Sequence, residues 1–305
     1  MKLVLRQFAI ACAALLGGCA LPMVGPDYQA PDMHLPSQWS AVASGTVAPA
    51  EDRTRLARWW TQFGDETLDG LIGQALAGNL DLKLAQARLN QARANRLSAD
   101  AGLYPTISAS ASRTRSKSAD AIAVQPTRTL YDAGFDATWE LDIFGGNRRG
   151  SEAATADLAA SRASLDNTRV SLVAELARNY VELRSSQHRM AIARDNLASQ
   201  SETLQITEWR YQAGLARASE VEQARTSREQ TRAGIPDLEV SLAAAENRIA
   251  LLLGLNPGDL HTRLAETKPL PAVADSVATG IPADVLRQRP DLIVAERTLA
   301  AETAR

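Results

Sequence analysis

The sequence predicts a mainly α-helical protein with a small β-hairpin of membrane-crossing length. One observation is a seven-residue repeat of apolar positions within residues 147–253, which predicts a long α-helical coiled-coil hairpin. Another is the stretch 105–144, where apolar and polar residues alternate with period two, as they do in half-buried strands. A third is an apolar run at the N-terminus that ends at a cysteine and has the anatomy of an export signal.

Composition and charge argue against several classes of function. The formal net charge is −2 and the pI is about 6.0, so there is no basic excess to neutralise the phosphates of a nucleic acid. His34, His188 and His261 are scattered, and none has a Cys, Asp or Glu at metal-ligand spacing. Gly145-Gly146 lacks the Lys-Ser/Thr continuation of a phosphate-binding loop. We therefore expect no metal, no catalytic residues and no enzyme activity.

Residues 1–18 have the features of a bacterial signal peptide, with two basic residues ahead of an apolar run too short to span a bilayer. The run ends in Leu16-Gly17-Gly18-Cys19, which resembles a lipobox whose cysteine becomes the lipidated first residue of the mature protein. Cys12 would leave with the signal, so Cys19 has no partner for a disulfide within the chain. By resemblance to bacterial lipoproteins, Ala20 favours delivery to the outer membrane. The alternative is an ordinary cleaved signal with an incidental cysteine.

The next part of the chain is expected to be extended and then helical. Residues 19–64 contain five prolines and no sustained period, which predicts a segment that wraps a surface. In residues 65–104, Asp65 is placed to cap a short helix, and a second helix follows from about Leu80 to Leu103. The apolar faces of these two helices are Leu68, Leu71, Ile72, Ala75 and Leu76, and then Leu82, Ala85, Leu89 and Ala92.

Two alternating stretches predict a β-hairpin in residues 105–144. The apolar positions are Ile107, Ala109 and Ala111 in the first stretch, and Phe135, Ala137, Trp139, Leu141 and Ile143 in the second. About ten tilted residues suffice for a strand of a membrane barrel, and both stretches reach that length. Two strands alone would leave unpaired backbone groups in hydrocarbon, so strands from a repeat or from other subunits must close the barrel. The edge of a soluble sheet is the alternative.

Residues 147–253 carry the longest periodic signal of the chain. The apolar series is Leu158, Leu165, Leu172, Leu176, Leu183, Met190, Leu197, Leu204 and Tyr211 on the way out, and Leu238, Leu242, Ala245, Ile249 and Leu252 on the return. Such a series keeps one seam turned toward a partner helix, and the first arm would be roughly 100 Å long. Gly214 is expected to close this arm in the left-handed conformation, and Ser219 with Glu222 to form a capping box for the return helix. A soluble coiled-coil dimerisation arm is the alternative.

A weak internal repeat follows a linker of residues 254–282. The segment from Asn79 to Leu89 recurs from Arg289 to Leu299, and both copies follow a short apolar helix. A second copy would thus begin within residues 283–305 and be cut off there. If the second copy is as long as the first, the complete protein would need roughly 470 residues. The chain is therefore expected to be a fragment or a truncated reading frame.

Several short segments now support a resemblance to a known family. They are Val24-Gly25-Pro26-Asp27-Tyr28 with Pro31, Trp59-Trp60 to Phe63 with Asp65, Asn79 to Ala94, Trp139 to Gly145, Arg210-Tyr211 with Gly214 and Ser219, Leu252-Leu253-Gly254, and Arg289-Pro290-Asp291. In this order and spacing they resemble the TolC-type outer membrane factors, and specifically the lipoprotein branch, the NodT-like, RND-type outer membrane efflux lipoproteins. The resemblance covers nearly all of the chain from Cys19 onward.

The resemblance implies a homotrimer in which each protomer gives four strands to one twelve-stranded transmembrane barrel and its helices to a periplasmic tunnel. It implies that Gly214, Leu215 and Ser219, at the tip of the helical hairpin, contact a periplasmic adaptor protein. Closing a helical hairpin is the plainer role of Gly214 and Ser219. Gating residues of the family lie largely in a second hairpin that this chain lacks. The polar positions of the second strand, Asp136, Thr138, Glu140 and Asp142, are expected to line the channel lumen.

The function expected from the sequence is a passive export duct for drugs or other small molecules. It would be anchored to the outer membrane by a covalent lipid on Cys19, with no other cofactor, and would meet an adaptor and an inner-membrane pump. One alternative is a periplasmic adaptor lipoprotein, which also combines a lipobox with a coiled-coil hairpin. Another is a truncated lipoprotein that does not transport.

Overall fold

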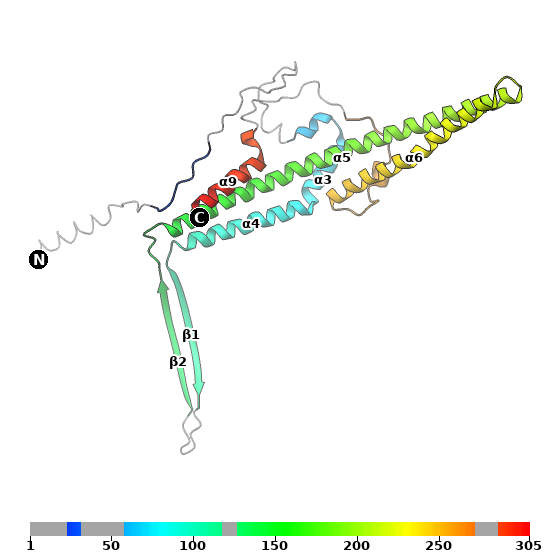
Figure 1. The fold of residues 1–305 in the computed structure, drawn as a ribbon. Coiled ribbons are helices and arrows are strands. Elements are labelled where there is room, and N and C mark those ends of the chain that lie inside the picture. The colour runs from blue at the N-terminus through cyan, green and yellow to red at the C-terminus, as the bar shows by residue number, and fades with distance from the viewer. Residues whose placement is uncertain (1–22, 32–57, 118–126, 272–285) are drawn as a thin grey trace, which may run out of the picture. The chain divides into compact units, whose positions relative to one another are not determined.

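The computed structural model describes residues 23–31, 58–117, 127–271 and 286–305 (Figure 1). The predicted signal peptide and Cys19 lie outside these residues. The elements are η1 (Trp59–Phe63), α3 (Glu66–Gly78), α4 (Leu80–Ala101), β1 (Thr106–Ser116), β2 (Arg128–Thr138), α5 (Gly146–Gln212), α6 (Ala218–Leu253), α7 (His261–Leu264) and α9 (Pro290–Ala304). They form two compact units: residues 33–87 with 163–292, and residues 1–32 with 88–162 and 293–305.

The first of these units contains the main hydrophobic core. Asp65 caps α3 as predicted, because its carboxylate accepts hydrogen bonds from the amides of Thr67 and Leu68 at 2.8 and 3.1 Å. One face of α3 is buried against the middle of α5 and the end of α6. The buried residues of this core are Leu68, Leu71, Ile72, Ala75, Leu172, Val173, Leu176, Ala177, Tyr180, Leu183, Ala245, Ile249, Ala250, Leu253, Leu260 and Leu264.

The two arms of the predicted coiled coil are confirmed as α5, of 67 residues, and α6, of 36 residues. Leu176 and Leu183 of the outgoing seam are fully buried, as are Ala245 and Ile249 of the return seam. Tyr211, the last residue of the series, is exposed because the arms end there. None of the described helices is long and apolar enough to cross a membrane.

The turn between the arms differs in one detail from the prediction. Gly214 adopts the left-handed conformation with φ of 72°, as predicted. The capping box at Ser219 and Glu222, however, is wrong. The helix α6 already begins at Ala218, and the Glu220 carboxylate accepts the backbone N–H of Arg217 at 3.2 Å. Ser219 therefore lies inside the first helical turn.

The strands β1 and β2 pair antiparallel over their full length, with Thr106 opposite Thr138 and Ser116 opposite Arg128. The predicted hairpin is confirmed, but its second strand ends earlier than the alternation suggested. After Thr138 the indole of Trp139 donates a hydrogen bond to the Leu103 carbonyl at 3.3 Å, and the chain turns toward the start of α5. Residues 139–143 are therefore not part of the strand.

The segment predicted as the start of a second repeat forms α9. Its residues Ala300, Ala301 and Ala304 are buried, and Arg305 forms an ion pair with Asp157 of α5 at 2.5 Å. In the same unit, Ser151 of α5 donates a hydrogen bond to the Asp100 carboxylate of α4 at 2.5 Å. The end of α4, the start of α5 and α9 thus belong to one packed group.

Candidate functional site

The tip of the helical hairpin is closed by its own backbone. The amide of Leu215 donates to the Arg210 carbonyl at 2.7 Å, and the amide of Gly214 donates to the Tyr211 carbonyl at 2.9 Å. These bonds satisfy the last carbonyls of α5. They leave the Leu215 side chain 71% exposed, although it is apolar. The three predicted contact residues, Gly214, Leu215 and Ser219, do lie together at the tip.

Ion pairs brace the two arms just behind the tip. Arg225 of α6 bridges to Glu208 of α5 at 3.4 Å and to Glu222 of its own helix at 2.9 Å. All three side chains are well exposed, so each pair contributes at most about 1 kcal/mol of stability. Of the two pairs, Arg225–Glu208 joins the arms close to the tip, and Arg225–Glu222 lies within α6.

The register of the β-hairpin separates its residues into two faces. One face carries the pairs Ile107–Ala137, Ala109–Phe135, Ala111–Ala133, Arg113–Tyr131 and Arg115–Thr129. The other carries Thr106–Thr138, Ser108–Asp136, Ser110–Gly134, Ser112–Asp132, Thr114–Leu130 and Ser116–Arg128. Every residue of both strands is exposed within the chain. The part of the first face nearest the helices, residues 107–111 and 133–137, is apolar and exposed, which suits lipid, and the mainly polar second face suits water.

The predicted lumen residues do not all lie on this polar face. Asp136 and Thr138 are in β2 and belong to it. Glu140 and Asp142 lie beyond the end of the strand, so the alternation that grouped them with Asp136 is broken. The Asp142 carboxylate instead accepts hydrogen bonds from the backbone amides of Asn147 and Arg148, at 3.2 and 3.0 Å, at the first turn of α5.

Arg149 of α5 clamps the described N-terminal segment onto the base of the hairpin. Its buried guanidinium donates to the carbonyls of Val24 and Gly25 at 3.3 and 3.1 Å, and to the carboxylate of Asp27 at 2.8 Å. The amide of Val24 also donates to the Phe144 carbonyl at 3.1 Å. The clamp holds a segment that begins four residues after Cys19.

A buried polar network lies beside the hydrophobic core. The Tyr180 hydroxyl donates to the Asp65 carboxylate at 2.5 Å and accepts from Arg184 Nε at 3.1 Å. Arg184 also donates to the Glu266 carbonyl at 2.6 Å, and Gln187 donates to the Leu264 carbonyl at 2.6 Å. The network therefore fastens both the start of α3 and the connection after α7 to the middle of α5.

Two pKa shifts follow from this network. Burial alone would raise the pKa of the Asp65 carboxyl, but hydrogen bonds from Tyr180 and from the Leu68 and Thr67 amides, together with the Arg184 charge, outweigh it. The pKa of Asp65 is therefore held below its ordinary value. Burial and the hydrogen bond to Asp65 raise the pKa of the Tyr180 hydroxyl.

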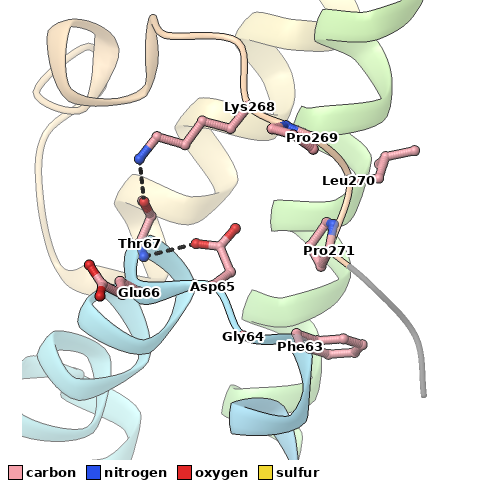
Figure 2. A pocket seen from close by; sticks show the side chains of 9 residues that line it. All are labelled: Phe63, Gly64, Asp65, Glu66, Thr67, Lys268, Pro269, Leu270 and Pro271. Atoms are coloured by element: carbon pink, nitrogen blue, oxygen red, sulfur yellow. Dashed lines mark hydrogen bonds between the residues drawn. The ribbon is translucent and has the colours of Figure 1, made fainter.

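A cleft of about 340 Å³ lies between the start of α3 and the segment 268–271 (Figure 2). Lys268 reaches across it and donates to the Thr67 hydroxyl at 3.1 Å, and the Thr67 amide is already bonded to Asp65. The segment 268–271 passes over the start of α3 at this cleft. The hydrogen bond between Lys268 and Thr67 joins the segment to the helix there. Among the described residues, no group of three or more His, Cys, Asp or Glu side chains is arranged to hold a metal ion.

The fold and these features define a class of protein: a long helical hairpin with an exposed tip, joined to a β-hairpin with one lipid-suited face. The model of the outer membrane efflux protein family matches residues 71–255. Nodulation protein T of Rhizobium leguminosarum bv. trifolii is 36% identical over 291 residues, 95% of this chain and 61% of that protein. The probable outer membrane lipoprotein SilC of Salmonella typhimurium is 30% identical, over 98% of this chain and 64% of that protein.

The solved structure of the outer-membrane channel OprN matches with a TM-score of 0.77 and 39% identity, over 92% of this chain and 62% of that one. The chain belongs to the outer membrane efflux protein family and has its TolC-like fold, as the sequence predicted. It spans less than two thirds of the length of these relatives.

Proposed function

We propose that the protein is the outer-membrane channel component of a tripartite export system. Family membership supports the location, and the β-hairpin carries the mechanism. Its apolar face would lie in lipid and its polar face, with Asp132 and Asp136, would line the water-filled path. Acidic side chains there would favour cations weakly. The path itself needs no energy, because the pump in the inner membrane would supply the driving force.

The two described strands cannot close a barrel by themselves, so the channel requires strands from other protein segments. We propose a homotrimer with a twelve-stranded barrel, as in the family that the sequence resembles, and the described hairpins of three copies would give six of those twelve strands. The exported compounds would be drugs or other small molecules. The family match argues against the periplasmic adaptor as the alternative, because it runs through α4, the β-hairpin and both arms of the helical hairpin.

The test of the channel is ion conductance in planar lipid bilayers. Purified trimers are expected to give discrete, ohmic current steps. Replacing Asp132 and Asp136 with asparagine should shift the reversal potential in a salt gradient toward weaker cation preference, because the lumen would lose negative charge. A flat trace from folded trimers that have inserted into the bilayer would refute the channel.

The adaptor contact is proposed to centre on Leu215 at the hairpin tip. The supporting observation is an apolar side chain that is 71% exposed on a loop closed by its own backbone. Leu215→Asp should weaken binding of the adaptor hairpin at least about tenfold, because burial of a charged group at an interface is costly. Leu251→Asp is the matched control, since Leu251 is 75% exposed on α6 and distant in sequence from the tip. Equal effects of the two substitutions would contradict a tip contact.

The lipid anchor is proposed to be a covalent acyl group on Cys19. Metabolic labelling with radioactive palmitate should mark the mature protein and leave Cys19→Ser unlabelled. Absence of label from the parent protein would refute the anchor while leaving the channel proposal intact. Acyl chains add membrane affinity through their buried methylenes, so the serine variant should also be depleted from the outer-membrane pellet.

A further inference from the structure

Cationic side chains gather at the end of the β-hairpin that lies farthest from the helices. Arg113 and Arg115 are in β1, Lys117 follows it, and Arg128 begins β2. The described residues 113–117 and 127–131 contain no acidic side chain. Asp132 is next in β2, but the register places it on the opposite face from Arg113.

The register shows which face these arginines occupy. Arg113 lies opposite Tyr131 and Arg115 opposite Thr129, on the face that also carries Ile107, Ala109 and Phe135. Both arginines are therefore on the apolar, lipid-suited side of the hairpin. Arg128 pairs with Ser116 on the polar side. The chain thus offers two cations on one face and a third cation, at nearly the same height, on the other.

The length of the strand sets the depth of the two arginines. The indole of Trp139 is tied to the Leu103 carbonyl at the base of the hairpin, beside the helices. Tyr131 lies eight residues before Trp139 and Thr129 ten residues before it. A tilted strand crosses the hydrocarbon core in roughly 9–11 residues. With the helices in the periplasm, Arg115 then lies level with the headgroups of the outer leaflet, and Arg113, two residues deeper, reaches toward them with its long side chain.

The energetics of lipid-facing arginine agree with that depth. An arginine on the outer face of a membrane barrel is strongly unfavourable at the bilayer midplane and nearly neutral at the interface. Two arginines on the same face therefore fix how far the hairpin enters the membrane. Tyr131 supports the first of them, because the Arg113 guanidinium lies over its ring at 5.5 Å from the centroid. A tyrosine at this level is also typical of the interfacial aromatic girdle.

A guanidinium presents a planar fork of donors that matches phosphate oxygens. We propose that Arg113 and Arg115, with Tyr131 orienting the first, form a site for a phosphate-bearing lipid headgroup of the outer leaflet. The site rests on the proposed membrane insertion of the hairpin. Its ligand class is an anionic, phosphorylated lipid, and it would make insertion of the channel depend on the composition of that leaflet.

The experiment uses the whole protein in phosphatidylcholine vesicles that contain lipid A, a phosphorylated glycolipid. The quantity measured is the lipid A that stays with the protein after extraction in mild detergent. The double variant Arg113→Gln/Arg115→Gln should retain at least about fivefold less, since it loses both charge-assisted contacts. Arg128→Gln, on the opposite face, should retain as much as the parent. The double lysine variant should recover part of the loss, because lysine keeps the charge without the fork.

Three further measurements separate the causes of failure. Flotation of the unacylated Cys19→Ser protein with pure phosphatidylcholine vesicles reports insertion without the proposed anchor; if this protein does not float, the proposed membrane insertion fails and this site with it. If all variants float and retain equal lipid A, only the headgroup site is refuted. Equal retention of dephosphorylated lipid A would overturn phosphate recognition. Loss of lipid A in the presence of free inorganic phosphate would show that the site takes phosphate from any source.

Discussion

The hydrophobic core of the helices and the β-hairpin use apolar side chains in opposite ways. In the core, Leu71, Leu176 and Ile249 are fully buried by segments of the same chain. In the hairpin, Ile107 is 73% and Phe135 is 85% exposed within the chain. The first region is completed by its own sequence, whereas the second has apolar residues that stay exposed within the chain. In the proposed channel, lipid and neighbouring strands would cover them.

The largest effects should come from exchanging a large residue for alanine in each region. Leu176→Ala should lower the free energy of unfolding by about 2–5 kcal/mol, because it removes buried methylenes and leaves a cavity. Phe135→Ala should leave that free energy nearly unchanged for the whole protein in detergent-free buffer, yet weaken membrane insertion by about 1.5–3 kcal/mol. Chemical denaturation and vesicle partitioning measure the two quantities. A large loss of helical stability from Phe135→Ala would contradict the contrast.

A smaller effect is expected at the clamp between the N-terminal segment and α5. Arg149→Ala removes three hydrogen bonds from a buried guanidinium to Val24, Gly25 and Asp27. Local opening of residues 23–31 should become easier by about 1.5–3 kcal/mol, the usual contribution of a charge-assisted hydrogen bond. Hydrogen exchange of the Val24 amide, which is bonded to Phe144, reports this directly. Arg162→Ala, an exposed arginine of the same helix, should leave the exchange unchanged.

A still smaller loss of folding stability is expected when the polar network of Asp65, Tyr180 and Arg184 is disrupted. Tyr180→Phe removes the hydroxyl that joins Asp65 to Arg184 and should cost about 1–2 kcal/mol of folding stability. Tyr211→Phe is the matched control, because Tyr211 is 50% exposed at the end of α5 and its substitution should cost nothing measurable. If thermal denaturation shows the same transition for both variants, the network does not stabilise the fold.

The smallest expected effect is a change with pH. Because the pKa of Asp65 is lowered in the folded protein, its contribution is fully present above the ordinary value of 3.8 and is lost as pH falls through the folded value. Asp65→Asn should flatten this part of the stability profile between roughly pH 5 and pH 2. Asp166→Asn, at an exposed position of α5, should keep the profile of the parent. An unchanged slope in Asp65→Asn would contradict the lowered pKa.

Much of the fold could be predicted from sequence because its long helices and its strands follow regular spacings of apolar residues. The seven-residue series predicted both arms of the helical hairpin, and Gly214 marked its turn. The errors occurred where a local pattern in the sequence is not followed by the structure. Ser219 with Glu222 matches the sequence pattern of a capping box, yet α6 begins after Arg217, which is not a preferred cap residue. The alternation of β2 likewise continues in the sequence through Ile143, although the strand ends at Thr138. The structure had to show that Asp142 caps α5.

The contacts that the sequence could not predict join residues far apart in the chain. Besides its neighbour Glu152, Arg149 bonds to three residues more than 120 positions away, and nothing near it in the sequence indicates them. Nothing near Tyr180 indicates Asp65. The cationic end of the β-hairpin is different, because its residues are visible in the sequence. Only the register of the two strands shows that Arg113 and Arg115 share a face with the apolar residues, while Arg128 does not.

In the proposed channel, neighbouring residues of β2 face different solvents. Single-cysteine labels in place of Phe135 or Asp136, in protein reconstituted into vesicles, test it through fluorescence quenching. We expect a quencher attached to lipid chains to quench the label at position 135 more strongly, and aqueous iodide to quench the label at position 136 more strongly. Equal quenching of the two labels by both agents would contradict the placement of this hairpin in the membrane.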